Sequence, residues 1–120
     1  MEGTWPVRSS ESAPPENDPM LRTPLCEFLR IDLPIIQAAM AACTSAELAS
    51  AVSNAGGLGT IASALIPIED FKSQLERTAK LTERPFAVNH SIPFLKEEAF
   101  AATLAARPAV ISFALGDPGD

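Results

Sequence analysis

Short apolar runs alternate along the chain with segments whose apolar residues recur at helical spacing. Four runs are apolar along most of their length, which is typical of strands covered on both faces. These runs are residues 34–40, 58–64, 85–90 and 109–115. Their order predicts an alternation of strand and helix from about Leu21 onward.

The first predicted helix follows residues 34–40 and has a signal at each end. Thr44 and Glu47 have the spacing of a capping box, a hydroxyl followed three residues later by a carboxylate. Behind them an apolar stripe recurs at the i, i+3, i+4 and i+7 positions of a helix. Its members are Leu48, Ala51, Val52 and Ala55. Gly56 and Gly57 predict the end of this helix, because glycine adopts the left-handed conformation at low cost.

Two further helices complete the alternation. Pro67 suits a first helical turn, and Phe71, Leu75 and Ala79 follow at four-residue steps, which predicts a helix to about Leu81. Residues 96–106 predict the third helix, and residues 116–120 consist of turn formers.

The spacing of the predicted strands indicates part of a barrel. Their centres, near residues 37, 61, 88 and 112, lie 24, 27 and 24 residues apart. Strand and helix alternating at this pitch imply right-handed parallel crossovers, and an eight-unit barrel takes about 30 residues a unit. We therefore predict an α/β fold over residues 21–120, a partial (β/α)8 TIM barrel of about four parallel βα units. Its open first and fourth strands predict self-association.

Residues 1–20 differ from the rest in composition. Four prolines stand among serine, glutamate, asparagine and aspartate, with little to bury except Trp5 and Val7. Burial of so little apolar surface cannot offset the entropy of ordering the chain, so we predict a disordered N-terminal arm.

Charge and cysteine content exclude several classes of function. Nine Lys and Arg residues against fifteen Asp and Glu residues give a net charge of −6, which disfavours nucleic acid as a partner. Two cysteines are too few for a disulfide framework or a cysteine-built zinc site, and we predict no metal site. No apolar run approaches the roughly 20 residues of a membrane span. We expect a cytoplasmic protein with no membrane partner.

Several stretches together resemble one known family. Residues 34–41, which read Pro-Ile-Ile-Gln-Ala-Ala-Met-Ala, and residues 45–59, which end in Gly-Gly-Leu-Gly, closely resemble the start of the nitronate monooxygenase family. Residues 84–89 and 112–118 resemble its third and fourth strands. The resemblance implies an FMN-binding (β/α)8 barrel whose members oxidise alkyl nitronates with molecular oxygen.

The resemblance also implies cofactor-binding residues. The loop after the first strand would lie against the flavin ring; it consists of Ala38, Ala39, Met40 and Ala41. Asn89 matches an asparagine that hydrogen-bonds the flavin, and Gly116 matches a small residue that lets backbone approach the substrate side. The family usually has proline where Ala39 stands.

The family's catalytic histidine and phosphate-gripping loops come from later strands, so the resemblance assigns no catalytic residue here. We expect an enzyme that is incomplete in this chain, with the 120 residues alone inactive and binding FMN weakly or not at all. The alternative is a non-catalytic half-barrel remnant or interaction module that complements a separate C-terminal half.

His90 is the single histidine and follows Asn89 at the presumed mouth of the site. A neutral imidazole there could abstract a carbon-bound proton. A residue that packs in the core or at the rim is the other interpretation.

Other candidate residues have simple structural interpretations. Residues 57–62 match G-x-G-x-x-A but follow a helix, so we interpret them as a helix stop and a close-packed strand entry rather than a dinucleotide site. A doubly wound nucleotide-binding domain would need glycines where residues 41–44 read Ala-Ala-Cys-Thr. We expect Cys43 to be a buried thiol, and Asp117 and Asp120 to be solvated carboxylates in a turn.

Overall fold

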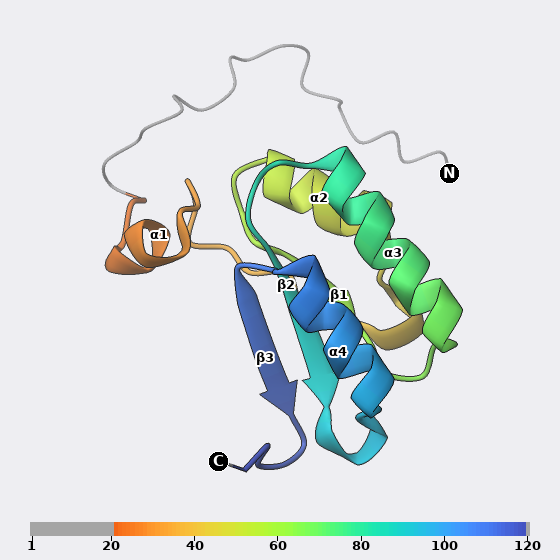
Figure 1. Cartoon of the computed structure of the whole chain (residues 1–120). Coiled ribbons are helices and arrows are strands. Elements are labelled where there is room, and N and C mark those ends of the chain that lie inside the picture. Colours follow the sequence, from red (N-terminus) through yellow and green to blue (C-terminus); the bar gives the residue numbers. More distant parts are fainter. Residues whose placement is uncertain (1–20, 120) are drawn as a thin grey trace, which may run out of the picture.

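A sheet of three parallel strands forms the centre of the computed structural model, which describes residues 21–119 (Figure 1). The strands are β1 (Gly59–Ala62), β2 (Phe86–Ser91) and β3 (Val110–Ala114), in the spatial order β1-β2-β3. The α-helices are α1 (Pro24–Leu29), α2 (Ala46–Asn54), α3 (Ile68–Leu81) and α4 (Glu97–Ala106). Two short 3-10 helices are η1 (Ala41–Cys43) and η2 (Ile92–Phe94). The predicted arm, residues 1–20, lies outside the described residues.

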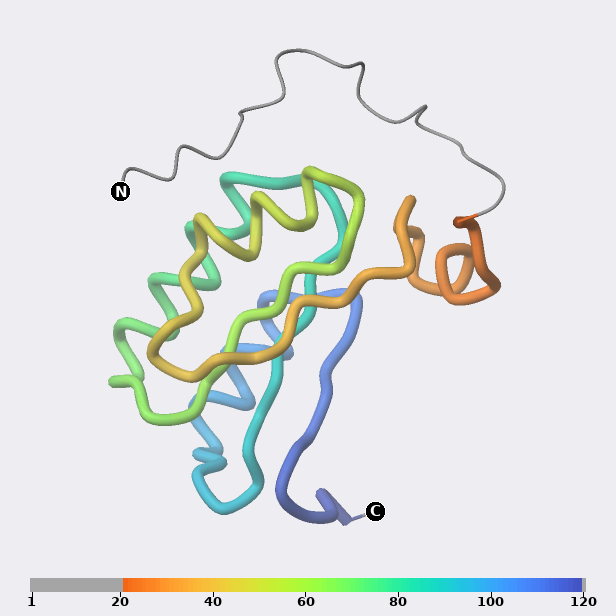
Figure 2. The backbone as a smooth tube through the Cα atoms, turned by 180° about the vertical axis from the view of Figure 1, so that it is seen from behind, coloured from red at the N-terminus to blue at the C-terminus, as the bar shows by residue number. Residues whose placement is uncertain are grey.

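The predicted alternation of strand and helix is confirmed from α2 to β3. Pro67 stands immediately before α3, and α4 begins at Glu97, one residue later than expected. Helices α2, α3 and α4 all lie on one side of the sheet, and the other face has no helix over its centre (Figures 1 and 2). This one-sided cover follows from parallel strands joined by crossovers of the same hand.

The main core lies between the sheet and this helical layer. It joins Phe71 and Leu75 of α3 to Ile61 of β1 and Val88 of β2, all at most 3% exposed. Full burial of each large side chain contributes about 1.5–3 kcal/mol to folding. The apolar runs that form β1 and β2 are therefore largely buried, as predicted, whereas all five residues of β3 are only half-buried.

Helix α2 turns a different face to the sheet from the one expected. Its buried residues are Ala46, Ala49, Ser50 and Ser53, whereas Leu48, Ala51 and Ala55 of the predicted stripe are exposed. The cause is close contact with β1, because a Cβ on Gly59 would lie 1.9 Å from the carbonyl oxygen of Ala49. At that separation only small side chains fit, so α2 buries alanine and serine rather than leucine.

The start of α2 also differs by one residue from the prediction. Ser45, not Thr44, is the N-cap, and its Oγ accepts a hydrogen bond from the backbone N–H of Leu48 at 3.1 Å. Thr44 is instead buried, and its Oγ1 accepts from the N–H of Met40 at 3.0 Å. The predicted stop is confirmed at Gly56, which follows the helix with φ 102°.

Ser53 connects α2 to two strands at their amino-terminal ends. Its side chain is fully buried; the hydroxyl donates to the carbonyl oxygen of Pro85 at 2.8 Å and accepts from the N–H of Gly59 at 3.0 Å. Both backbone groups would otherwise lack a partner at a place closed to water. The hydroxyl therefore fixes where β1 and β2 begin relative to the helix.

The predicted first strand, residues 34–40, is reduced to a single parallel bridge between Ile36 and Leu58. Beyond the bridge, the side chain of Gln37 makes the hydrogen bonds to β1 that strand backbone would otherwise make. Its Oε1 accepts from the N–H of Thr60 at 3.3 Å, and its Nε2 donates to the carbonyl oxygen of Thr60 at 3.2 Å. Because the Gln37 carboxamide pairs with both backbone groups of Thr60 in β1, the residues that follow Gln37 do not pair with the sheet. The prediction of four strands becomes three strands and one bridged segment.

Helix α1 was not predicted, and it belongs to a second apolar cluster at the amino-terminal ends of the strands. Cys26 and Ile31 pack there with Leu58 and Ala87. Leu58 and Ala87 face away from the helical layer, because side chains alternate along a strand and their neighbours Gly59 and Phe86 face that layer. Residues 24–31 therefore cover one end of the otherwise open face.

Candidate functional site

The carboxyl ends of the strands bring small and polar side chains into one row. Ala62, Asn89 and Ser112 stand opposite one another in the register of β1, β2 and β3. Their side chains face away from the helical layer, since Ile61 and Val88 next to them pack against it. In Figure 1 the arrowheads of β2 and β3 point to this end of the sheet. Carboxyl ends of parallel strands are where α/β barrels hold their chemistry.

Asn89 has a fixed orientation in this row. Its Nδ2 donates to the Oγ of Ser112 at 2.9 Å and to the carbonyl oxygen of Ser112 at 3.4 Å. A carbonyl oxygen can only accept, so the amide nitrogen of Asn89 must face β3. Its Oδ1 has no hydrogen-bond partner within residues 21–119 and is left as an acceptor for a ligand N–H or O–H.

The predicted flavin loop lies at the same end of the sheet. Ala38, Ala39 and Met40 follow Gln37, which pairs with Thr60 two residues before the end of β1. All three are exposed, with Met40 at 41%, and Ala41 is half-buried at the start of η1. The structure therefore brings the loop and Asn89 to one edge, and contact with a flavin stays a prediction.

Gly116 is placed where two loops touch. It follows β3 with φ 154°, and a Cβ there would lie 3.0 Å from the Cβ and Cγ2 of Ile92 in η2. Absence of a side chain lets the loop after β3 pass closely over the loop after β2. Gly116 thus shares the edge with Asn89, and its predicted role toward substrate stays a prediction.

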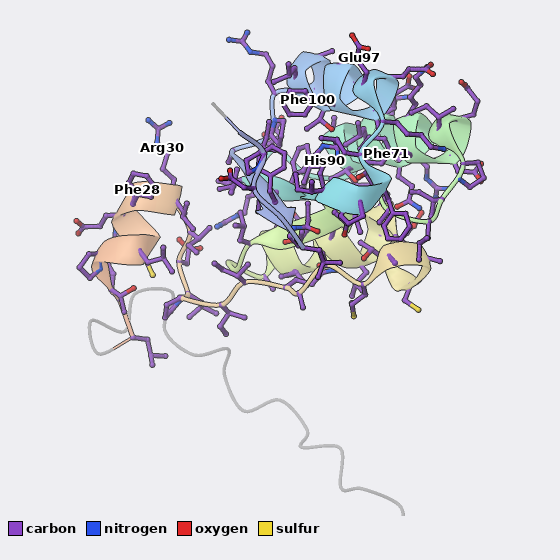
Figure 3. All side chains as sticks on the ribbon, turned by 90° about the horizontal axis from the view of Figure 1, so that it is seen from below. Phe28, Arg30, Phe71, His90, Glu97 and Phe100 are labelled. Carbon is purple, nitrogen blue, oxygen red and sulfur yellow. The ribbon has the colours of Figure 1, made fainter. Side chains whose placement is uncertain are left out.

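The structure places His90 in the core rather than at the mouth. Its side chain is fully buried on the helical side of the sheet, opposite to that of Asn89. Three aromatic rings surround it, those of Phe71, Phe100 and Phe113, with centroids 5.7–6.1 Å away (Figure 3). This burial lowers the pKa of His90. The packing interpretation is the one that fits, and we assign His90 no catalytic role.

Hydrogen bonds fix the tautomer of His90. Thr103 donates its hydroxyl proton to the carbonyl oxygen of Ala99 at 2.9 Å, so its Oγ1 must accept from Nε2 of His90 at 3.0 Å. The proton therefore resides on Nε2, and Nδ1 accepts the hydroxyl of Ser63 at 2.7 Å. The buried imidazole is fully paired without being charged.

The remaining sequence candidates have structural explanations. Gly59 permits the close contact of α2 with β1, which confirms the close-packed entry proposed for residues 57–62. Cys43 is exposed, so the expectation of a buried thiol was wrong, because η1 lies at the rim and not under a helix. Asp117 accepts from the N–H of Gly119 at 3.0 Å in an exposed turn, as expected. Asp120 lies outside the described residues.

Two residues of this edge were missed from the sequence. Gln37 ends the pairing of the first segment, and Ser112 orients Asn89. Strand periodicity alone marked both as strand centres and gave no sign of a polar role. The signal that could have found Ser112 is its register opposite Asn89, which requires knowing the strand pairing.

Two kinds of feature are absent from the part of the chain described. Within residues 21–119 no group of three His, Cys, Asp or Glu side chains is placed to hold a metal ion. No helix in that range combines the length and apolar character needed to cross a membrane.

Comparison with known proteins gives a consistent relationship. The sequence profile of a family described as nitronate monooxygenase matches residues 22–118. Over 69 residues the chain is 42% identical to a probable nitronate monooxygenase of Staphylococcus haemolyticus, a match that covers 58% of this chain and 19% of the relative. It is 41% identical, with the same coverage, to a Mycobacterium tuberculosis (3aS,4S,5R,7aS)-5-hydroxy-7a-methyl-1-oxo-octahydro-1H-indene-4-carboxyl-CoA dehydrogenase.

The fold has solved counterparts. The structure of FabK from Thermotoga maritima superposes with a TM-score of 0.73 at 30% identity, covering 81% of this chain and 32% of that one. The chain thus matches about a fifth of the length of the curated relatives and a third of FabK. With its parallel strands and one-sided helical layer, the described part has the fold of a TIM-barrel segment. Because the family profile spans nearly all of residues 21–119, the chain belongs to the nitronate monooxygenase family.

Proposed function

We propose that this chain contributes the ring-binding part of an FMN site in an oxidoreductase that oxidises alkyl nitronates with molecular oxygen. The observation that carries the proposal is the edge formed by Asn89, Ser112 and residues 38–41 at the carboxyl ends of the strands. Membership of the nitronate monooxygenase family supports the class of reaction. FMN, when bound, supplies the redox chemistry.

The residues at this edge fit a flavin ring. The unpaired Oδ1 of Asn89 can accept from a ring N–H, and its orientation is set in advance by Ser112. The exposed alanines at positions 38 and 39 and the glycine at 116 leave room for a flat ring to approach backbone. The exposed side chain of Met40 offers a polarizable, apolar contact.

The same edge is less suited to the phosphate of FMN. Within residues 21–119 the loops after β1, β2 and β3 carry one cationic side chain, Lys96, and no arginine. We therefore propose that the phosphate is held by residues other than these, and that the chain alone binds FMN weakly. A nitronate is already deprotonated at carbon, so the reaction does not require the buried His90 as a base.

Oxygen consumption tests the proposed function. The full chain is supplied with excess FMN and either propyl-2-nitronate or neutral 2-nitropropane, alone and mixed with the carboxyl-terminal two thirds of a family member. We expect FMN-dependent oxygen uptake with the nitronate in the mixture and little with the chain alone. Rapid turnover by the chain alone would contradict the incomplete site, and absence of uptake in a mixture that forms a stable complex would contradict the activity.

An interaction module is the second candidate function, and the exposed side of β3 favours it. All five residues of β3 are half-buried, and Leu115 directly after it is 74% exposed. An unpaired strand edge beside apolar side chains is suited to pairing with another polypeptide. In the same mixing experiment, a complex that binds no FMN and consumes no oxygen would favour this candidate.

A further inference from the structure

A cavity within residues 21–119 lies at the amino-terminal ends of the strands, away from Asn89. Its volume is about 700 Å³. Three parts of the chain line it: the end of α1, the segment from the end of α3 into β2, and the turn between α4 and β3. Each part contributes one arginine, namely Arg30, Arg84 and Arg107. Parts of the chain far apart in sequence thus each place one arginine at the wall of this cavity.

These arginines make the cavity locally positive in an acidic protein. Arg84 donates from Nη1 to Oδ2 of Asp32 at 2.6 Å, which holds its side chain in place. Arg30 and Arg107 form no ion pair with any residue of 21–119. Counting the lining Glu83 and the paired Asp32, the local charge is 3 − 2 = +1, against −6 for the chain. The cavity therefore favours an anion, although the chain as a whole is acidic.

Two of the arginines stand where glycine is the usual residue. Arg30 ends α1 with φ 57°, and Arg107 ends α4 with φ 51°, both left-handed. A side chain at such a position strains the backbone. Cations do interact favourably with helix carboxyl termini, but a position in the last turn would give that benefit without the strain. Two helix ends beside this cavity therefore each carry an arginine in spite of the backbone strain.

The rest of the wall is apolar. Phe28 is 84% exposed and projects from the same side of the end of α1 as Arg30 (Figure 3). Leu29, Pro85 and Phe86 extend this surface into the cavity. Guanidinium groups bind phosphate with paired, charge-assisted hydrogen bonds, and an aromatic side chain stacks on a flat apolar group. A ligand with both features would contact all of the wall.

We propose that this cavity is a binding site for a phosphorylated small molecule that carries an apolar or aromatic group. Arg30 and Arg107 bind the phosphate, Arg84 is positioned by Asp32 beside them, and Phe28 contacts the apolar group. The proposal does not depend on flavin binding, because the site lies at the other end of the strands from Asn89.

A titration of the full chain followed by isothermal calorimetry tests this proposal. The probes are phenyl phosphate, inorganic phosphate and phenol at constant ionic strength. We expect saturable binding of phenyl phosphate, roughly tenfold weaker binding of inorganic phosphate and none of phenol. Arg30→Gln and Arg107→Gln should each weaken phenyl phosphate binding about tenfold, and Arg30→Lys less.

Two control variants make the outcome decisive. Arg77→Gln removes an arginine that pairs with Glu47 outside the cavity, and it should change the affinity less than twofold. Equal weakening by Arg77→Gln, or no saturable binding by a wild type with native circular dichroism, overturns the proposal. A chain with Glu11→Gln, Glu16→Gln and Asp18→Asn tests whether the acidic residues 1–20 are the natural occupant. If this variant binds phenyl phosphate and the wild type does not, residues 1–20 compete for the cavity, and the proposal of a small-molecule ligand is overturned.

Discussion

At the scale of single residues, buried hydroxyl groups determine how α2 meets the sheet. Ser53 satisfies one donor in β1 and one acceptor before β2 with a single oxygen. Ser50 is also buried on the same helix, but its Oγ has no hydrogen-bond partner. Substitution of each serine therefore compares the loss of a hydrogen-bonded buried hydroxyl with the loss of one that has no hydrogen-bond partner.

We predict that Ser53→Ala lowers the free energy of unfolding by about 2 kcal/mol, because the N–H of Gly59 and the carbonyl of Pro85 lose their buried partner. Ser50→Ala removes the same atoms without breaking a hydrogen bond, so it should be neutral or slightly stabilising. Urea denaturation of the two variants and the wild type measures both. Equal losses for the two would contradict the role given to Ser53.

His90 makes stability depend on pH. Burial lowers its pKa in the folded state, so below its ordinary value of 6.5 the unfolded chain takes up a proton that the folded chain refuses. We predict that stability is full above pH 6.5 and falls as the pH drops toward the lowered pKa. His90→Leu should remove this part of the pH dependence. Urea midpoints at pH 7.5, 6.5 and 5.5 test it, and parallel curves for both proteins would contradict it.

At the scale of elements, the sequence predicted three strands and three helices close to their observed bounds, because apolar runs and glycines that end helices depend only on residues close in sequence. It misjudged the face of α2, since Leu48 looks like a core residue until the contact of Ala49 with Gly59 is known. Sequence reasoning also did not predict that the first strand is reduced to a single bridge, for a similar reason. A glutamine carboxamide that replaces backbone pairing, as in Gln37, depends on a partner 23 residues away.

The contact between α2 and β1 leads to a prediction at this scale. Gly59→Ala would force a methyl group into the backbone of α2 at Ala49, so we expect a loss of several kcal/mol or a failure to fold. Gly119→Ala adds the same group in open space at φ 80°, where only the backbone strain of about 1 kcal/mol applies. Thermal unfolding by circular dichroism compares them. Similar melting temperatures would contradict the close contact.

At the scale of the whole molecule, the fold places two chemically different regions at opposite ends of one sheet. The carboxyl ends carry amide, hydroxyl and small side chains around Asn89, whereas the amino ends carry three arginines. Sequence resemblance pointed to the first region through Asn89, residues 38–41 and Gly116. It gave no indication of the second, because Arg30, Arg84 and Arg107 converge only through tertiary structure.

The open face and the free side of β3 predict self-association of the isolated chain. Leu115, directly after β3, is 74% exposed. Sedimentation at tens of micromolar should detect dimers or larger species, and Leu115→Lys should shift them toward monomer by adding charge at the edge. A wild type that sediments as a monomer over this range would contradict the prediction.

If the carboxyl ends of the strands hold a flavin ring, as proposed, titration of the full chain with riboflavin will show it in the amide NMR spectrum. Riboflavin has the ring of FMN without the phosphate, so the arginine cavity cannot attract it by charge. We predict shifts at Asn89, Ser112, Gly116 and residues 38–41, and their loss in Asn89→Ala but not in Asp117→Asn. Saturating riboflavin that leaves these signals unmoved, or moves only those around Arg30 and Arg107, would contradict a flavin-ring site at this edge.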